Sequence, residues 1–280
     1  MLPTSHHITI EGRELHYMEW GADHADTVIA WHGLARTGRD MDDLALHLAA
    51  RYRVICPDTI GRGLSQWSPN PEAEYCLAFY AKLAVGLADA LNIGELDWVG
   101  TSMGGALGIK LAAGALSDRI KRLVLNDIGP QIAEAATERI RGYAGSPPEF
   151  DTLGELEQYF RTVYKPYGWL SDTQWRRLAI SSARRKDSGK IAPHYDPKMV
   201  LQFTEHPRDY ELWDDWDRIE VPTLVLRGED SDLLLAEVAR EMTQRGPKAR
   251  LVEIAGCGHA PALNVPGQLG LIADFLAAEI

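Results

Sequence analysis

Residues 96–105 read Leu-Asp-Trp-Val-Gly-Thr-Ser-Met-Gly-Gly, and they predict a buried strand that turns at once into a helix. Gly100 and Gly104 flank Ser102, where a crossing strand and helix would leave no room for a side chain. Such a turn would hold the Ser102 hydroxyl outward above the sheet. It would also leave the backbone amide of Met103 free at a helix N-terminus, where negative charge is favoured.

The rest of the chain supplies the strands that surround this turn. Short apolar runs alternate with segments of helical spacing, and the runs cover residues 27–31, 53–56, 122–126, 223–226 and 250–254. This alternation predicts an α/β fold with a mostly parallel sheet and helices on both faces. At the N-terminus, residues 6–18 alternate in polarity around Gly12 and predict an antiparallel hairpin.

Composition limits the partners of the chain. The formal net charge of −11 argues against binding to nucleic acid or to an anionic membrane surface. No apolar run is long enough for membrane insertion. The three cysteines, Cys56, Cys76 and Cys257, have no metal-like spacing and are typical of a reduced cytoplasmic protein. We expect a monomer or homodimer that acts on a small molecule without a metal or cofactor.

The alternation of strand with helix stops over residues 131–217, which contain 13 of the 23 aromatic residues. This segment predicts a helical lid over the C-terminal edge of the sheet, where ligands of open α/β sheets bind. Residues 1–130 and 218–280 would then form the core domain. If the tryptophans of the lid line its pocket, the substrate carries a bulky apolar group; these tryptophans are Trp169, Trp175, Trp213 and Trp216.

A serine, a histidine and carboxylates follow the predicted strands in an order that suggests nucleophilic catalysis. Ser102 needs a base within hydrogen-bond reach to lose its proton at neutral pH, and His259, in the loop after the last strand, is the candidate. A carboxylate on the other imidazole nitrogen would fix the tautomer. Asp232 is the preferred acid because an apolar run follows it directly, and Asp230 and Asp127 are the alternatives.

The loop after the first buried strand supplies a candidate backbone amide for an oxyanion hole. Residues 31–36 read Trp-His-Gly-Leu-Ala-Arg, and a loop at this place contributes a backbone amide to an oxyanion hole when the nucleophile lies on a strand–helix turn. The Leu34 amide would join that of Met103. In the next loop, Asp58 and Arg62 are expected to pair and brace the turn.

With these motifs the chain resembles the α/β-hydrolase superfamily, in particular its lid-bearing serine hydrolase branch. The resemblance rests on residues 31–34, 57–65, 100–105, 226–232 and 258–260. It implies about eight strands, a helical lid after the sixth strand, and hydrolysis through an acyl-enzyme with a Ser-His-Asp triad. Serine at position 102 disfavours the related epoxide hydrolases and haloalkane dehalogenases, which carry aspartate there.

The function that we expect is hydrolysis of a small carboxylic ester or similar acyl compound. The same residues would also suit carbon–carbon bond hydrolysis of a ring-fission product, or acyl transfer. A non-catalytic ligand-binding protein is the alternative from another class.

Overall fold

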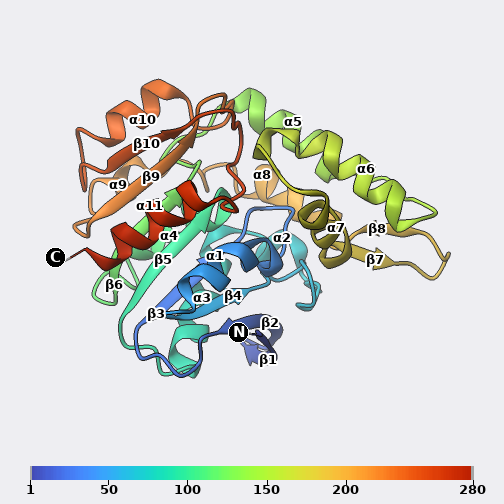
Figure 1. Cartoon of the computed structure of the whole chain (residues 1–280), viewed down its shortest axis with the longest axis horizontal. Helices are drawn as coiled ribbons and strands as arrows, with labels where there is room; N and C mark the ends of the chain where they lie inside the picture. Colours follow the sequence, from blue (N-terminus) through green and yellow to red (C-terminus); the bar gives the residue numbers. More distant parts are fainter. Residues whose placement is uncertain (1, 279–280) are drawn as a thin grey trace.

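The computed structural model describes residues 2–278, and its centre is an eight-stranded sheet (Figure 1). The strands are β1 Thr4–Ile10, β2 Arg13–Trp20, β3 Thr27–Trp31, β4 Arg53–Pro57, β5 Leu96–Thr101, β6 Ile120–Asn126, β9 Thr223–Gly228 and β10 Arg250–Ile254. They lie in the order β1-β2-β4-β3-β5-β6-β9-β10. β2 pairs antiparallel with both β1 and β4, whereas every later pair is parallel. The predicted mostly parallel sheet of about eight strands is confirmed.

Helices cover both faces of the sheet because its central strands are apolar on both sides; β3, for example, is buried along its whole length. One apolar cluster joins one face to α1 Asp42–Leu48 and α11 Pro266–Ala277. The other joins the opposite face to α3 Leu77–Ala90, α4 Met103–Ala112 and α10 Ala236–Met242. The short helix α2 Pro71–Glu74 precedes α3. No helix within residues 2–278 is both long and apolar enough to cross a membrane.

The N-terminal hairpin forms as predicted. β1 and β2 pair from Thr4 opposite Glu19 to Ile10 opposite Arg13. The two residues between the strands, Glu11 and Gly12, have positive φ angles of 52° and 72°. A two-residue turn of this kind matches the twist of an antiparallel pair, and glycine adopts it without strain.

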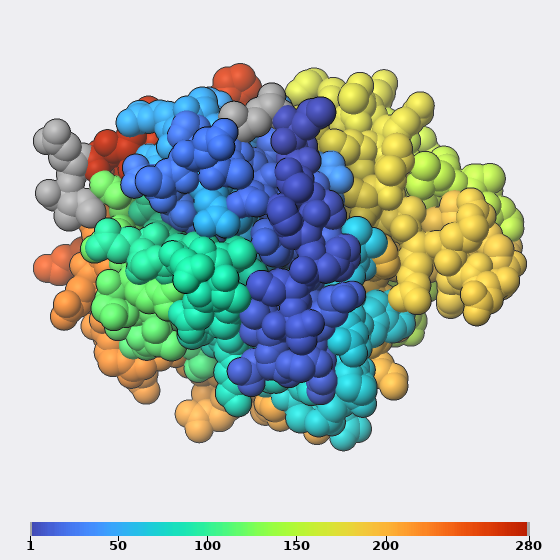
Figure 2. Space-filling view, turned by 90° about the horizontal axis from the view of Figure 1, so that it is seen from below, coloured from blue at the N-terminus to red at the C-terminus, as the bar shows by residue number. Residues whose placement is uncertain are grey.

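Residues 131–217, between β6 and β9, form what we call the insertion. Its residues 134–193 pack beside the sheet and form one side of the molecule, whereas its residues 213–216 return to the main core beside α4 (Figures 1 and 2). Its helices are α5 Glu134–Ala144, α6 Leu153–Val163, α7 Asp172–Ser181, α8 Gln202–Glu205 and α9 Trp213–Trp216. It has a small apolar core of its own, formed mainly by α6 and α7. It also contains an antiparallel pair, β7 Ala183–Arg185 with β8 Ile191–Pro193, where the sequence predicts helices alone. Strands of three residues are too short to show an alternating pattern.

The parallel strands bring their carboxyl ends to one edge of the sheet. The loops that follow β3, β5, β6, β9 and β10 therefore meet there, although they are far apart along the chain.

Candidate active site

Ser102 lies at the sharp turn between β5 and α4. Its backbone has a φ of 52° and a ψ of −119°, a conformation that non-glycine residues rarely adopt. A Cβ at Gly100 would lie 2.2 Å from the Gly104 carbonyl oxygen, and one at Gly104 would lie 2.4 Å from the Trp31 carbonyl oxygen. The Ser102 amide donates to the Asn126 carbonyl at 3.0 Å, which ties the turn to β6. The glycines are thus needed for close packing of backbone on backbone.

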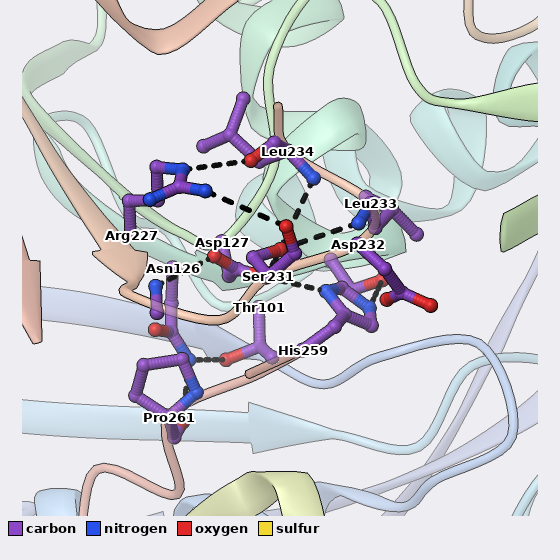
Figure 3. Close-up of polar contacts among 12 residues, drawn as sticks. Thr101, Asn126, Asp127, Arg227, Ser231, Asp232, Leu233, Leu234, His259 and Pro261 are labelled. Atoms are coloured by element: carbon purple, nitrogen blue, oxygen red, sulfur yellow. Dashed lines mark hydrogen bonds and ion pairs between the residues drawn. The ribbon is translucent and has the colours of Figure 1, made fainter. Parts of the chain in front are cut away.

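Three side chains from three loops form a continuous hydrogen-bonded series at this edge. His259 Nε2 lies 2.9 Å from Ser102 Oγ. His259 Nδ1 lies 2.7 Å from Asp127 Oδ2 (Figure 3). The Asp127 side chain is fully buried, whereas the His259 side chain is 13% exposed. An imidazole between a hydroxyl and a buried carboxylate can accept the serine proton and be stabilised once it carries charge.

Within residues 2–278 the preferred acid candidate, Asp232, forms no hydrogen bond or ion pair with His259. Its carboxylate accepts two hydrogen bonds of 2.9 Å from Arg139, and its side chain is 53% exposed. Asp230 is also exposed. The path of the loop after β9 explains the difference, because it turns Ser231 inward and leaves the aspartates on either side in solvent.

Asp127, the alternative that directly follows β6, takes the place expected for Asp232. Oδ1 accepts from the Gly228 amide at 2.8 Å. Oδ2 accepts from the Ser231 hydroxyl at 2.6 Å as well as from His259 (Figure 3). Three donors around one buried carboxylate stabilise its charged form. The chain order of serine, acid and histidine is unchanged. The sequence signal for Asp127 is its position directly after a buried strand.

Two backbone amides lie free near the serine. Met103 begins α4, so its amide has no carbonyl partner within the helix. Neither this amide nor that of Leu34 donates to another backbone group within residues 2–278. Gly33 packs directly against Ser102, because a Cβ built on it would lie 3.6 Å from the serine Cβ. Two unpaired amides beside a nucleophile are what an oxyanion hole requires.

His32 holds the peptide group that carries the Leu34 amide. The Thr59 amide donates to His32 Nε2 at 2.9 Å, so the ring proton is on Nδ1, which donates to the Gly33 carbonyl at 2.6 Å. Burial lowers the pKa of His32 from 6.5 to about 4, so the ring is neutral at pH 7. Since the Gly33 carbonyl and the Leu34 amide belong to one planar peptide group, His32 fixes the direction of that amide.

Arg62 braces the same loop, although not through the predicted pair with Asp58. Its Nε donates to the Leu34 carbonyl at 2.8 Å, and one Nη donates to the Tyr80 hydroxyl at 2.9 Å. Asp58 instead contacts His16 at 2.7 Å. A fully buried guanidinium is stable here because carbonyl and hydroxyl oxygens surround it.

A cavity of about 40 Å³ opens beside Ser102 and His259. The insertion contributes Ile140, Tyr143, Tyr164 and Tyr167 to its lining. A second cavity of about 50 Å³ shares Tyr167 and part of the Gly33 loop with the first and extends toward the rim between α7 and the loop after β10. The two cavities therefore lie next to each other between the insertion and the loops at the carboxyl ends of the strands.

The tryptophans of the insertion lie elsewhere. Trp216 is fully buried in the main core, and Trp175 is buried in the core of the insertion. Trp169 is 68% exposed, and the Trp213 indole bonds to the Gln131 side chain. The cavity wall is therefore built from tyrosines, which combine an apolar ring with a polar hydroxyl. Within residues 2–278 there is no group of three or more His, Cys, Asp or Glu side chains that could hold a metal ion.

Comparison with known proteins agrees with this geometry. Residues 26–264 match the model of the alpha/beta hydrolase fold family. The chain is 38% identical over 270 residues to the 3-hydroxybutyrate-oligomer hydrolase of Cupriavidus necator, covering 92% of this chain and 91% of the relative. It is 27% identical over 244 residues to the 2-hydroxy-6-oxo-2,4-heptadienoate hydrolase of Pseudomonas putida, covering 83% and 81%.

Solved structures share the architecture. The crystal structure of an alpha/beta hydrolase from Novosphingobium aromaticivorans superposes with a TM-score of 0.87 at 34% identity, covering 98% of each chain. With a family match over most of its length and relatives that are hydrolases, this chain belongs to the α/β-hydrolase family and is a hydrolase.

Proposed function

We propose that this hydrolase cleaves a carboxylic ester through an acyl-enzyme, with Ser102 as nucleophile, His259 as general base and Asp127 as the acid that orients His259. The observation that carries the proposal is the unbroken hydrogen-bonded series from Ser102 Oγ through His259 to the buried Asp127. Asp127 replaces Asp232 in this role because its carboxylate, unlike that of Asp232, forms a hydrogen bond with the imidazole.

The reaction has two halves. Ser102 Oγ attacks the ester carbonyl and its proton passes to His259 Nε2, which then gives that proton to the leaving alcohol oxygen. Water next enters, loses a proton to His259 and attacks the acyl carbon, and Ser102 recovers its proton as the acid is released. In both tetrahedral intermediates the amides of Leu34 and Met103 hold the oxyanion. Each donor of this kind stabilises the transition state by about 3 kcal/mol.

The substrate class that fits is a short hydroxyacyl ester. One relative, 38% identical, is named for the hydrolysis of 3-hydroxybutyrate oligomers. The cavity beside Ser102 is small and carries Tyr143, Tyr164 and Tyr167. Burial raises the pKa of all three hydroxyls, so they stay protonated and can donate to a substrate hydroxyl or a second ester carbonyl. A wall of tryptophan would suit a bulky apolar group instead.

The insertion acts as a lid in this proposal. Residues 131–217 supply one wall of the cavity, and residues 1–130 and 218–280 supply the serine, the histidine, the acid and both amides. Closing such a wall over the ester would exclude bulk water and strengthen the polar contacts inside.

The test is the release of 3-hydroxybutyrate from its linear dimer by purified enzyme. We expect Ser102→Ala to lower kcat by roughly 10⁴-fold or more, as loss of a nucleophile does in serine hydrolases. Ser117, exposed in the turn after α4, provides the matched control, and Ser117→Ala should leave kcat unchanged. Retention of turnover by Ser102→Ala would refute the acyl-enzyme.

A hydroxyl deletion tests the substrate class separately. Tyr143→Phe should lower kcat/KM for the dimer by roughly threefold to tenfold, which corresponds to one hydrogen bond. It should not change kcat/KM for p-nitrophenyl butyrate, which lacks the hydroxyl. Equal effects on both esters would contradict recognition by Tyr143.

Carbon–carbon hydrolysis is the second candidate, and the relative from Pseudomonas putida favours it. Steady-state kinetics on 2-hydroxy-6-oxo-2,4-heptadienoate, compared with the hydroxybutyrate dimer, separate the two. A higher kcat/KM for the diketone would replace the ester proposal.

A further inference from the structure

A second hydrogen-bonded series of serine, histidine and aspartate lies outside the site described above. His16 Nε2 is 2.8 Å from Ser5 Oγ, and His16 Nδ1 is 2.7 Å from Asp58 Oδ2. The corresponding distances in the series of Ser102 are 2.9 and 2.7 Å. The two series therefore share both the order of groups and the spacing of their atoms.

The pairing of three strands creates this second series. Ser5 in β1 lies opposite Met18 in β2, and His7 lies opposite His16. Ser5 and His16 are thus diagonal neighbours on the same face of the hairpin, within reach of one another. Asp58 follows β4, the other neighbour of β2, and its amide donates to the His16 carbonyl at 2.8 Å.

Asp58 determines which ring nitrogen of His16 carries the proton. Burial would by itself raise the pKa of this carboxyl, but hydrogen bonds from His16 and from the Leu64 amide lower it below its usual range. The Gly38 amide donates to the other oxygen at 2.7 Å. Because the ionised carboxylate only accepts, His16 carries its proton on Nδ1 in the neutral ring, and Nε2 faces the Ser5 hydroxyl as an acceptor.

The serine at the end of this series lies at the surface. His16 is 2% exposed, but Ser5 is an exposed residue of β1, the edge strand of the sheet. The hairpin lies at the surface of the molecule, where it is dark blue in Figure 2. A nucleophile, a base within hydrogen-bond reach and a third group that orients the base are the components of an activated serine.

We propose that Ser5 is a second acylation site of this protein, which takes the acyl group of an activated ester such as an aryl acetate with His16 as its base. The bond between the acyl carbon and the aryl oxygen breaks, and a bond to Ser5 Oγ forms. The Ser5 proton passes to His16 Nε2 and from there to the phenolate, so one phenol leaves for each ester formed.

The backbone around Ser5 sets the limit of this chemistry. Ser5 lies in a paired strand, without the positive φ and the helix N-terminus found at Ser102. Ser5 therefore lacks the helix N-terminal amide that lies beside Ser102, so we expect the reaction to be slow and the acyl group to remain on the serine. The site is thus one of single covalent modification, not of turnover.

The experiment uses the full chain with Ser102→Ala, so that the main site cannot react. After incubation with p-nitrophenyl acetate, peptide mass spectrometry locates each acetyl group, and neutral hydroxylamine distinguishes serine esters from amine amides. We expect one hydroxylamine-sensitive acetyl group at Ser5. General-base help should make this reaction roughly 10²-fold faster than that of Ser188, an exposed serine whose Oγ accepts from the Lys190 amide and has no histidine partner in the described part of the chain.

Two further variants in the same background complete the test. Ser5→Ala, at an exposed position, should remove the label and leave the fold intact. His16→Asn retains a donor toward Asp58 but no base, and should reduce labelling of Ser5 to the rate of Ser188. Equal labelling of Ser5 and Ser188 with His16 present, or no ester at Ser5, would overturn the proposal even if His16→Asn does not fold.

Discussion

Two aspartates of this chain differ in what surrounds their charge. Asp127 is fully buried, and its oxygens accept from Gly228, Ser231 and His259. Asp232 is half exposed and pairs with Arg139 in solvent. A buried carboxylate against an imidazole fixes the tautomer of that ring, whereas an exposed ion pair contributes little to structure or reaction.

Asparagine at each position should separate the two roles. We expect Asp127→Asn to lower kcat on an ester by roughly 10³–10⁴-fold, because the amide stabilises the wrong tautomer of His259. Asp232→Asn, which loses only an exposed pair, should stay within about twofold of wild type. Steady-state kinetics measure both, and circular dichroism checks the fold. The opposite ranking would restore Asp232 as the acid.

His32 predicts a pH dependence of stability. Burial lowers its pKa to about 4 in the folded chain, against 6.5 for an ordinary histidine. As the pH falls from about 6.5 to about 4, the unfolded chain binds the proton first, so this group destabilises the fold by up to about 3 kcal/mol. Its contribution is constant above pH 7.

Urea unfolding between pH 4 and 7 measures this change, and NMR of the imidazole identifies the group. We expect the His32 ring to remain neutral at pH 5, with its proton on Nδ1. A ring that titrates near pH 6.5 in the folded protein would contradict the assignment.

Among the elements, the turn from β5 to α4 depends most on the absence of side chains. Gly100, Gly104 and Gly105 each have backbone or buried side-chain atoms within 2.4 Å of the place where a Cβ would lie. The strand, the helix and the loop after β3 therefore approach one another backbone to backbone. This approach places Ser102 and the Leu34 loop together.

Alanine at two helical glycines tests this packing. A Cβ at Gly104 would lie 2.4 and 2.8 Å from the carbonyl oxygens of Trp31 and His32, so Gly104→Ala should destabilise the fold by about 3 kcal/mol or more. Gly142 lies inside α5 with nothing within 4 Å of its Cβ position. Gly142→Ala should stabilise by about 0.5–1 kcal/mol. Urea unfolding measures both, and a neutral Gly104→Ala would refute the packing argument.

On the scale of the whole molecule, Arg36 connects the core to the insertion. It forms two hydrogen bonds to Asp40, of 2.6 and 2.8 Å, and one of 2.9 Å to Ser182 in the insertion. Its guanidinium also lies over the rings of Phe160 and Tyr164, 5.3 and 4.7 Å from their centroids. A planar cation suits this position because it can stack and donate at the same time.

Lysine at position 36 should loosen the insertion. Arg36→Lys retains the charge but loses the paired hydrogen bonds to Asp40 and the stacking on the two aromatic rings. We expect this loss to lower the free energy of unfolding by about 1–3 kcal/mol. We expect faster amide hydrogen exchange in α6 and a roughly tenfold lower kcat/KM. Arg177 provides the control, because its pair with Asp43 is at the rim and its side chain is 39% exposed. If the amide hydrogens of α6 exchange at the same rate in Arg36→Lys and in Arg177→Lys, Arg36 does not hold the insertion to the core in the way that we describe.

Much of this protein was predictable from local patterns alone. The alternation of apolar runs with helical segments, the glycines around Ser102 and the polar hairpin around Gly12 depend on neighbouring residues, and they predict the sheet, the sharp turn and the first two strands correctly. Ser102 and His259 could be selected for the same reason, since Ser102 directly follows β5 and His259 lies in the loop that follows β10, and both strands end at the same edge.

The tertiary structure alone decided which carboxylate reaches His259 and which aromatic residues face the serine. Asp127 and Asp232 both follow strands that end at the correct edge, and only the path of the loop after β9 turns Ser231 inward and Asp232 into solvent. Tyrosines line the cavity because of how the insertion folds onto the sheet. Strand and helix periodicity is a property of a few consecutive residues, whereas the direction of a loop side chain depends on contacts with residues about a hundred positions away.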